Sequence, residues 1–92
     1  MYAMLWSLEE LEEMILPGLR RLSGELQKKI IKIAKTNQPV IAYDLAEATL
    51  RNHGYSPTEA VSIARSASWL AVAHRDKREE SGFERIVAKL AL

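Results

Sequence analysis

The stretch YSPTEA, residues 55–60, opens the helical pattern on which the interpretation of this 92-residue sequence depends. Ser56 suits the cap position before a helix, Pro57 suits the first helical position, and Glu59 can complete a capping box. At 100° per residue, one face of the segment that follows is apolar: Ala60, Ile63, Ala64, Ala67, Leu70 and Ala71. The sequence therefore predicts an amphipathic helix that begins at Pro57 and ends near Ala73.

The opposite face of this predicted helix carries side chains that suit contact with a partner: Thr58, Ser62, Arg65, Ser66 and Trp69. A solvated surface helix usually carries Glu and Lys there, whereas short hydroxyl side chains let another backbone come close. Close packing against another helix of the same chain would favour the same small residues. Trp69, with its large apolar area, is more typical of a core or a subunit interface. This face is the first candidate for a functional surface.

Length and composition limit the possible classes of protein. The 92 residues suffice for one domain, and 48% hydrophobic with 27% charged residues is the balance of a soluble globular chain. The absence of cysteine excludes disulfides, thiolate metal sites and a cysteine nucleophile. The net charge of +1 favours no particular partner. The apolar residues 1–6 are far fewer than the roughly 20 of a membrane span, which predicts an intracellular, cytoplasmic protein without membrane contact.

A helix is also predicted near the start of the chain. Ser7 and Glu10 can form a capping box, and apolar side chains follow at helical spacing: Leu8, Leu11, Met14 and Ile15. The pair Pro17 and Gly18 is expected to end or kink this helix. Residues 1–22 are therefore predicted to be an N-terminal amphipathic helix and a candidate dimerisation element.

The next part of the chain mixes helical and β-favouring patterns. Ser23 caps a predicted helix that ends near Lys35, and its lysines point mostly outward: Lys28, Lys29, Lys32 and Lys35. Val40 and Ile41 form a short β-branched pair, predicted as a brief strand, before residues 42–53 return to helical spacing. One side of that helix is predicted to carry Leu45, Ala46, Thr49 and Leu50.

The C-terminal segment permits two structures. Residues 83–90 contain β-favouring side chains in imperfect alternation after a plausible turn at residues 80–82, which predicts a charged hairpin over residues 74–90. A helix would instead place four apolar side chains inward: Phe83, Ile86, Val87 and Leu90. We favour the hairpin, with the helix as the alternative.

Read in order, residues 24–90 give a helix, a short strand, a helix, a turn, a capped helix and a hairpin, and the stretch QPVIAYDLAE, residues 38–47, is the closest local match. This order resembles the winged helix-turn-helix family of DNA-binding domains. The resemblance implies a mainly α fold with a small β-hairpin, in which residues 23–92 form the winged helix-turn-helix domain behind an added N-terminal helix. It also implies a homodimer that binds double-stranded DNA as a small transcriptional regulator or DNA-associated accessory protein.

In this family the capped helix would enter the major groove and the hairpin would be the wing. The resemblance assigns base or phosphate contacts to four residues of the helix: Thr58, Ser62, Arg65 and Ser66. It assigns contacts with the DNA backbone or minor groove to four cationic residues: Arg75, Lys77, Arg78 and Arg85. Because an added N-terminal helix frequently builds a dimer in this family, the interface candidates are Trp6, Leu8, Leu11 and Trp69.

A second resemblance indicates a different class of function. Residues 54–60 resemble the turn between helices in small three-helix modules of the ubiquitin-associated type, which bind protein partners. The chain would then be an all-α interaction or oligomerisation module without DNA binding, and Trp69 and Val72 would anchor the partner. A hairpin over residues 74–90 favours DNA binding, whereas a helix there favours the interaction module.

The sequence contains no pattern that is typical of an enzyme, a metal site or a cofactor site. His53 and His74 are far apart and have no carboxylate at ligand spacing, whereas a metal site needs three or four convergent ligands. No Gly-rich phosphate loop and no Ser/His/Asp arrangement occurs. We therefore expect no catalytic residue, no metal, no cofactor and no small-molecule substrate.

Overall fold

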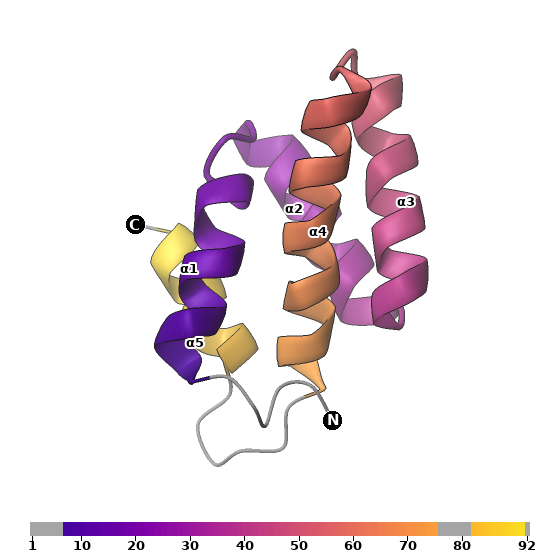
Figure 1. The fold of residues 1–92 in the computed structure, drawn as a ribbon. Coiled ribbons are helices and arrows are strands. Elements are labelled where there is room, and N and C mark those ends of the chain that lie inside the picture. Colours follow the sequence, from indigo (N-terminus) through magenta and orange to yellow (C-terminus); the bar gives the residue numbers. More distant parts are fainter. Residues whose placement is uncertain (1–6, 76–81, 92) are drawn as a thin grey trace.

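The computed structural model describes residues 7–75 and 82–91, and within them the regular structure is five helices (Figure 1). Their bounds are Leu8–Leu19 for α1, Gly24–Thr36 for α2, Pro39–Asn52 for α3, Pro57–His74 for α4 and Gly82–Leu90 for α5. The described residues contain no strand, so the predicted winged helix-turn-helix fold with a β-hairpin is wrong. None of the described helices is both long and apolar enough to cross a membrane.

The helix α5 replaces the predicted hairpin because two large side chains repeat at helical spacing. Phe83 and Ile86 lie three residues apart, and both are buried against the other helices. In a strand they would face opposite sides, which would leave one of them exposed. Residues 80 and 81, which belong to the predicted turn, lie outside the described residues.

The predicted strand pair Val40 and Ile41 lies instead in the first turn of α3. Pro39 is the first helical residue, where its fixed φ suits the helix and its missing N–H costs nothing. The hydroxyl of Ser68 in α4 donates a hydrogen bond to the Pro39 carbonyl at 3.1 Å. This bond ties the start of α3 to α4, so local β propensity is overridden by packing.

Serine caps define where three of the helices begin. The predicted cap of α4 is confirmed, since Ser56 Oγ accepts a hydrogen bond from the Glu59 backbone N–H at 3.2 Å. Ser7 and Ser23 cap α1 and α2 in the same way. Each cap satisfies a backbone donor that has no partner inside its helix.

A glycine turn ends α3 and directs the chain back into α4. Gly54 has a φ of +92°, a conformation that disfavours side chains with a Cβ. The N–H of Gly54 donates to the Arg51 carbonyl at 3.1 Å, and the N–H of Tyr55 donates to the Leu50 carbonyl at 3.1 Å. This pair of bonds is a Schellman motif, and it lets α3 and α4 lie side by side in opposite directions (Figure 1).

The helix α4 is the centre of the described fold, because it contacts each of the other four described helices. Figure 1 shows it between α1 and α3. The residues that it buries are Ala60, Ile63, Ala64, Ser66, Ala67, Leu70, Ala71 and Ala73. Five alanines among them let neighbouring helices approach closely, and the larger side chains of α1, α2 and α3 fill the remaining core.

The helices α1 and α4 pack closely at Gly18. The helix α1 continues through Pro17 and Gly18 to Leu19, so the helix does not end at this pair. The hydroxyl of Ser66 in α4 donates to the Met14 carbonyl at 3.2 Å, one turn before Gly18. A Cβ on Gly18 would lie 2.2 Å from Ser66 Oγ and 3.0 Å from Ser66 Cβ. Glycine is therefore required by the packing at this position.

Gly18→Ala is expected to lower the free energy of unfolding by an amount on the order of 1 kcal/mol. Overpacking against Ser66 costs about 1–3 kcal/mol. Replacing a glycine inside a helix recovers only roughly 0.5–1 kcal/mol of this cost. Gly24→Ala is the matched control, since a Cβ on Gly24 meets no atom within 4 Å. Urea unfolding followed by circular dichroism measures both variants. Adding Ser66→Ala should restore part of the Gly18→Ala loss. Equal stability of the two alanine variants would contradict the close packing.

The helix α5 is held to α1 by a cluster of ion pairs as well as by apolar packing. Glu12 of α1 is only 7% exposed, although it is charged. Its carboxylate pairs with the Arg85 guanidinium and, at 2.6 Å, with the Lys89 ammonium group. Glu9 lies 3.6 Å from the Arg85 guanidinium at the rim. Two cations of α5 thus compensate a carboxylate that would otherwise be buried without a partner.

Glu12→Gln is expected to lower the free energy of unfolding by about 1–3 kcal/mol, since charged hydrogen bonds to Arg85 and Lys89 are lost. The estimate stays below that for a fully buried pair because the two cationic side chains remain 28% and 42% exposed. Glu13→Gln, at an exposed position of the same helix, is the control. Urea unfolding of both variants is the measurement, and an equal effect would show that the cluster does not stabilise the fold.

Candidate functional site

The hydroxyl face predicted on α4 is divided between solvent and core. Thr58, Ser62 and Arg65 are exposed, whereas Ser66 is only 4% exposed and bonds to α1. Trp69 is half-buried. Three of the side chains expected to contact DNA are therefore accessible, and the fourth serves internal packing.

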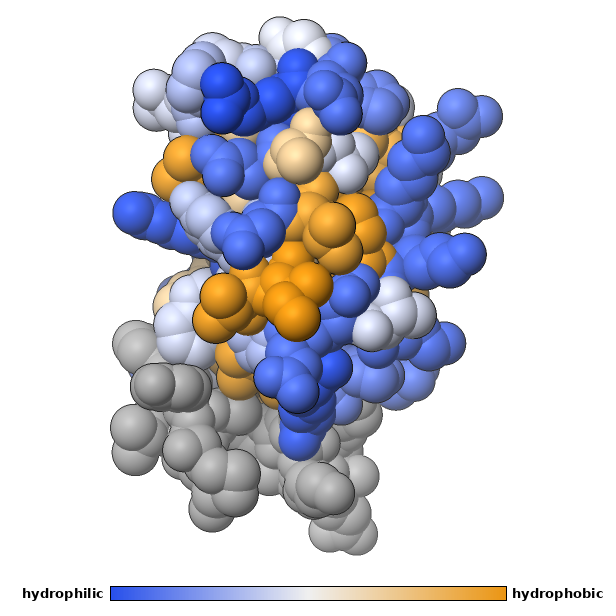
Figure 2. All heavy atoms as spheres, turned by 90° about the vertical axis from the view of Figure 1, so that its right-hand side faces the viewer, coloured by the Kyte–Doolittle hydropathy of each residue, from blue (hydrophilic) through white to orange (hydrophobic). Residues whose placement is uncertain are grey.

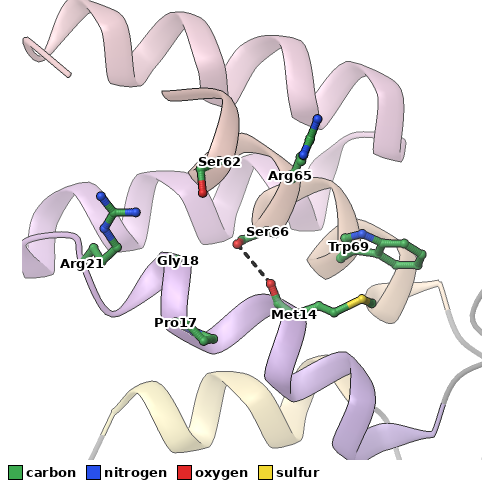
Figure 3. Close-up of a pocket in the computed structure, with 8 residues that line it drawn as sticks. All are labelled: Met14, Pro17, Gly18, Arg21, Ser62, Arg65, Ser66 and Trp69. Carbon is green, nitrogen blue, oxygen red and sulfur yellow. Dashed lines mark hydrogen bonds between the residues drawn. The ribbon is translucent and has the colours of Figure 1, made fainter. Parts of the chain in front are cut away.

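A groove runs between α1 and α4 beside these residues (Figure 3). Its volume is about 320 Å³, and it is lined by Met14, Pro17, Gly18, Arg21, Ser62, Arg65, Ser66 and Trp69. In Figure 3 the Trp69 ring lies beside the Met14 side chain, and Arg65 points away from α1. Arg21 pairs with Glu59 at 3.0 Å, so its charge is already compensated.

We call the exposed Thr58, Ser62 and Arg65 the α4 strip. The helix α4 that carries it is flanked by α1 and α3 (Figure 1). A second shallow hollow of about 480 Å³ continues the strip, with Pro57, Thr58, Val61, Ser62 and Arg65 around it. Thr58, Ser62 and Arg65 stay exposed between the two flanking helices.

The cationic residues predicted on the hairpin have other surroundings in the described part of the chain. Arg85 pairs with Glu12 and Glu9, and Arg75 donates a hydrogen bond to the Ala71 carbonyl at 3.2 Å. Lys77 and Arg78 lie outside the described residues. Of these four cations, Arg75 and Arg85 are therefore placed by the structure, and both are engaged by groups of the same chain.

The interface candidates on α1 face their own domain. Leu11 is fully buried, and Leu8 is half-buried against the start of α5 at Gly82. Trp6 lies outside the described residues. The apolar side of α1 therefore packs on α4 and α5.

Among the residues that the structure describes, the most exposed large apolar side chains lie on α3, a surface that the sequence interpretation missed. Val40, Ile41 and Leu45 are 74%, 50% and 43% exposed, and Ala48 on the same helix is also exposed. We call these four residues the α3 stripe. Figure 2, which views the α3 side, shows hydrophobic side chains gathered in one patch within a hydrophilic surround. The prediction that Leu45 and Leu50 share one side of this helix is wrong, because Leu50 is buried and Leu45 is exposed.

The two apolar faces of α3 follow from its helical geometry. At 100° per residue, Ala42, Ala46 and Leu50 share one face, and all three are fully buried. Measured around the helix from the centre of that buried face, Ile41 and Leu45 both lie more than a quarter turn away. The strand predicted at residues 40–41 excludes Ile41 from the helix, so the sequence interpretation did not recognise this second apolar face.

A lysine-rich edge lies next to the α3 stripe. A groove of about 270 Å³ between α2 and α3 is lined by Lys29, Lys32, Ile33, Thr36 and Thr49. All four lysines of α2 are exposed, and none forms an ion pair with any described residue. Thus one apolar surface is bordered by uncompensated positive charge.

Within the described residues, no three His, Asp or Glu side chains converge so that they could hold a metal ion. Comparison of the chain with protein-family models, with curated proteins and with solved structures finds no match.

Proposed function

We propose that this chain is an all-helical module that binds a partner protein through the α3 stripe. The observation that carries the proposal is that α3 has two apolar faces, one buried in the core and one exposed. A surface helix of a globular protein normally has one apolar face, and a helix that is apolar on more than one side is normally covered. A partner would supply the missing cover.

The spacing of the stripe supports a helical partner. Ile41, Leu45 and Ala48 lie at positions i, i+4 and i+7, the spacing through which helices dock on one another. Single exposed leucines are ordinary on protein surfaces, whereas neighbouring ones on a single helix form a contiguous patch. The stripe is therefore suited to bury a row of apolar side chains.

The rigidity of α3 also supports binding. Its start is bonded to α4 through Ser68, and its end is closed by the Gly54 turn. Its inner face is anchored in the core by Leu50. A surface that is held in place before binding loses little conformational entropy when a partner docks.

Binding of double-stranded DNA through Thr58, Ser62 and Arg65 stays a prediction. The α5 helix weakens the argument for DNA binding, because Arg85 pairs with Glu12 and is not presented on a wing. A gel shift with random duplex DNA at two salt concentrations tests it. Retardation that Arg65→Ala removes would favour DNA as the ligand.

The experiment for the proposed function compares proteins retained from a cell extract by the immobilised chain and by two double variants. Ile41→Asp/Leu45→Asp alters the stripe, and Thr58→Asp/Ser62→Asp alters the α4 strip with the same charge change. We expect specific partners to be lost from the first variant and kept by the second. If the partners are lost from the second variant alone, the binding surface lies on α4 and not on α3.

A further inference from the structure

We propose that the occupant of the α3 stripe is an amphipathic helix of a partner protein with carboxylates along the flank that faces α2. This inference rests on the proposed function and specifies its ligand. It is carried by the juxtaposition of the stripe with the lysine-lined groove between α2 and α3.

The stripe and the groove form one continuous surface. Thr49 lines the groove, and Leu45 lies one helical turn before it on the same side of α3. On the α2 side, the half-buried Ile33 adds apolar surface to the groove that Lys29 and Lys32 also line. With 14 residues, α3 is about 21 Å long, which matches the footprint of a single partner helix.

The charges on either side of this surface differ in sign. The α2 side presents Lys29 and Lys32 at the groove, and the only acidic residue of α2 is Glu25, in its first turn. The opposite side of α3 carries Asp44, Glu47 and Arg51, which leaves one net negative charge. Lysine stems can cover apolar surface while their ammonium groups reach the rim, where a carboxylate can pair with them. A helix with an acidic flank toward α2 therefore fits both the apolar floor and the charge.

Other occupants fit less of the surface. Nucleic acid would use the lysines but would leave the apolar side chains of the stripe uncovered. A second copy of this chain would offer its own α3 stripe with Asp44 and Glu47 beside it, but Arg51 on that side offsets one of the two carboxylates. Self-association is therefore an outcome that the experiment distinguishes. A partner helix that presents leucines and carboxylates together satisfies both requirements.

Three synthetic helical peptides of about 18 residues, roughly 27 Å of helix, provide the probes. The first has leucines on one face and glutamates on one flank, the second replaces the glutamates by glutamine, and the third replaces the leucines by serine. Each is titrated into the isotope-labelled full chain, and NMR chemical shifts report both affinity and location.

We expect the leucine–glutamate peptide to shift α3 and α2 signals and to bind about tenfold more tightly than the glutamine peptide at low salt, the effect of two or three surface ion pairs. The difference should shrink at about 0.5 M salt, where the Debye length falls to a few ångströms. Lys29→Gln/Lys32→Gln should abolish it. Lys28→Gln/Lys35→Gln, which removes the same charge outside the groove lining, should reduce it less.

Five outcomes would overturn the inference. Equal affinity of the glutamate and glutamine peptides would contradict the acidic flank of the partner helix but not the proposed function. Equal affinity of the serine and leucine peptides would show that charge alone binds. Concentration-dependent self-association through α3, or stronger α2 and α3 shifts with random duplex DNA, would name a different occupant. No α3 shift with any leucine peptide would contradict both the inference and the proposed function.

Discussion

Aspartate at both Ile41 and Leu45 is expected to weaken partner binding about a hundredfold or more, while the fold is retained. Fully burying an exposed Ile or Leu side chain contributes about 1.5–3 kcal/mol. Because Ile41 and Leu45 are 50% and 43% exposed, a partner can bury only about half of each side chain. The lost burial together with the cost of desolvating two carboxylates, about 1–3 kcal/mol each, exceeds the roughly 2.7 kcal/mol that corresponds to a hundredfold change in affinity.

The fold is expected to tolerate this double substitution because both side chains lie largely outside the core. Each is at least 43% exposed, and position 41 is in the first turn of α3, where an acidic side chain suits the helix dipole. Unfolding free energy should change by about 1 kcal/mol or less. Titration calorimetry with the leucine–glutamate peptide measures binding, and Thr58→Asp/Ser62→Asp is the control. Unchanged affinity with an intact fold would contradict the role of the stripe.

Leu50→Ala is expected to lower the free energy of unfolding by about 2–5 kcal/mol, because it leaves a cavity in the core. Leu50 is fully buried on the inner face of α3. For a domain of this size a loss near the upper end would leave little net stability. Urea unfolding at 25 °C measures the change.

Leu45→Ala is the matched control, with the same chemical change on the outer face of the same helix. Because Leu45 is 43% exposed, we expect a loss below about 1 kcal/mol. The two substitutions thus test the two faces of α3 separately. Leu50→Ala should lower stability, and Leu45→Ala should weaken binding. Similar losses of stability would mean that the outer face is part of the core.

Local sequence signals predicted most helix starts. Ser7, Ser23 and Ser56 were recognised as caps, since capping depends on side chains within a few residues of one another. The inner face of α4 was also predicted, because its alanines and larger apolar residues repeat at helical spacing. These features require no knowledge of distant contacts.

The C-terminal structure could not be predicted from local pattern alone. Residues 83–90 permit both a strand and a helix, and the helix packs Phe83 into the core while Arg85 and Lys89 pair with Glu12. Those two ion pairs connect residues more than 70 positions apart in sequence. Tertiary contacts therefore decided between two locally acceptable structures.

The candidate site was missed for a related reason. Five residues at 100° each place Leu45 and Leu50 about 140° apart on a helix, so the two leucines do not share one side. The strand predicted at Val40 and Ile41 also excludes Ile41 from the helix, and with it the outer-face neighbour of Leu45. Conversely, the Ser66 hydroxyl looked suited to a partner, but its hydrogen bond to Met14 depends on the approach of α1.

The most direct test of the account is an isotope-filtered NMR experiment on the methyl-labelled full chain with the unlabelled leucine–glutamate peptide. The account predicts intermolecular nuclear Overhauser effects from the peptide leucines to the Ile41 Cδ1 and Leu45 methyl groups. Contacts confined to Met14 and Trp69 in the α1–α4 groove, or none to α3 under conditions where the peptide binds, would contradict it.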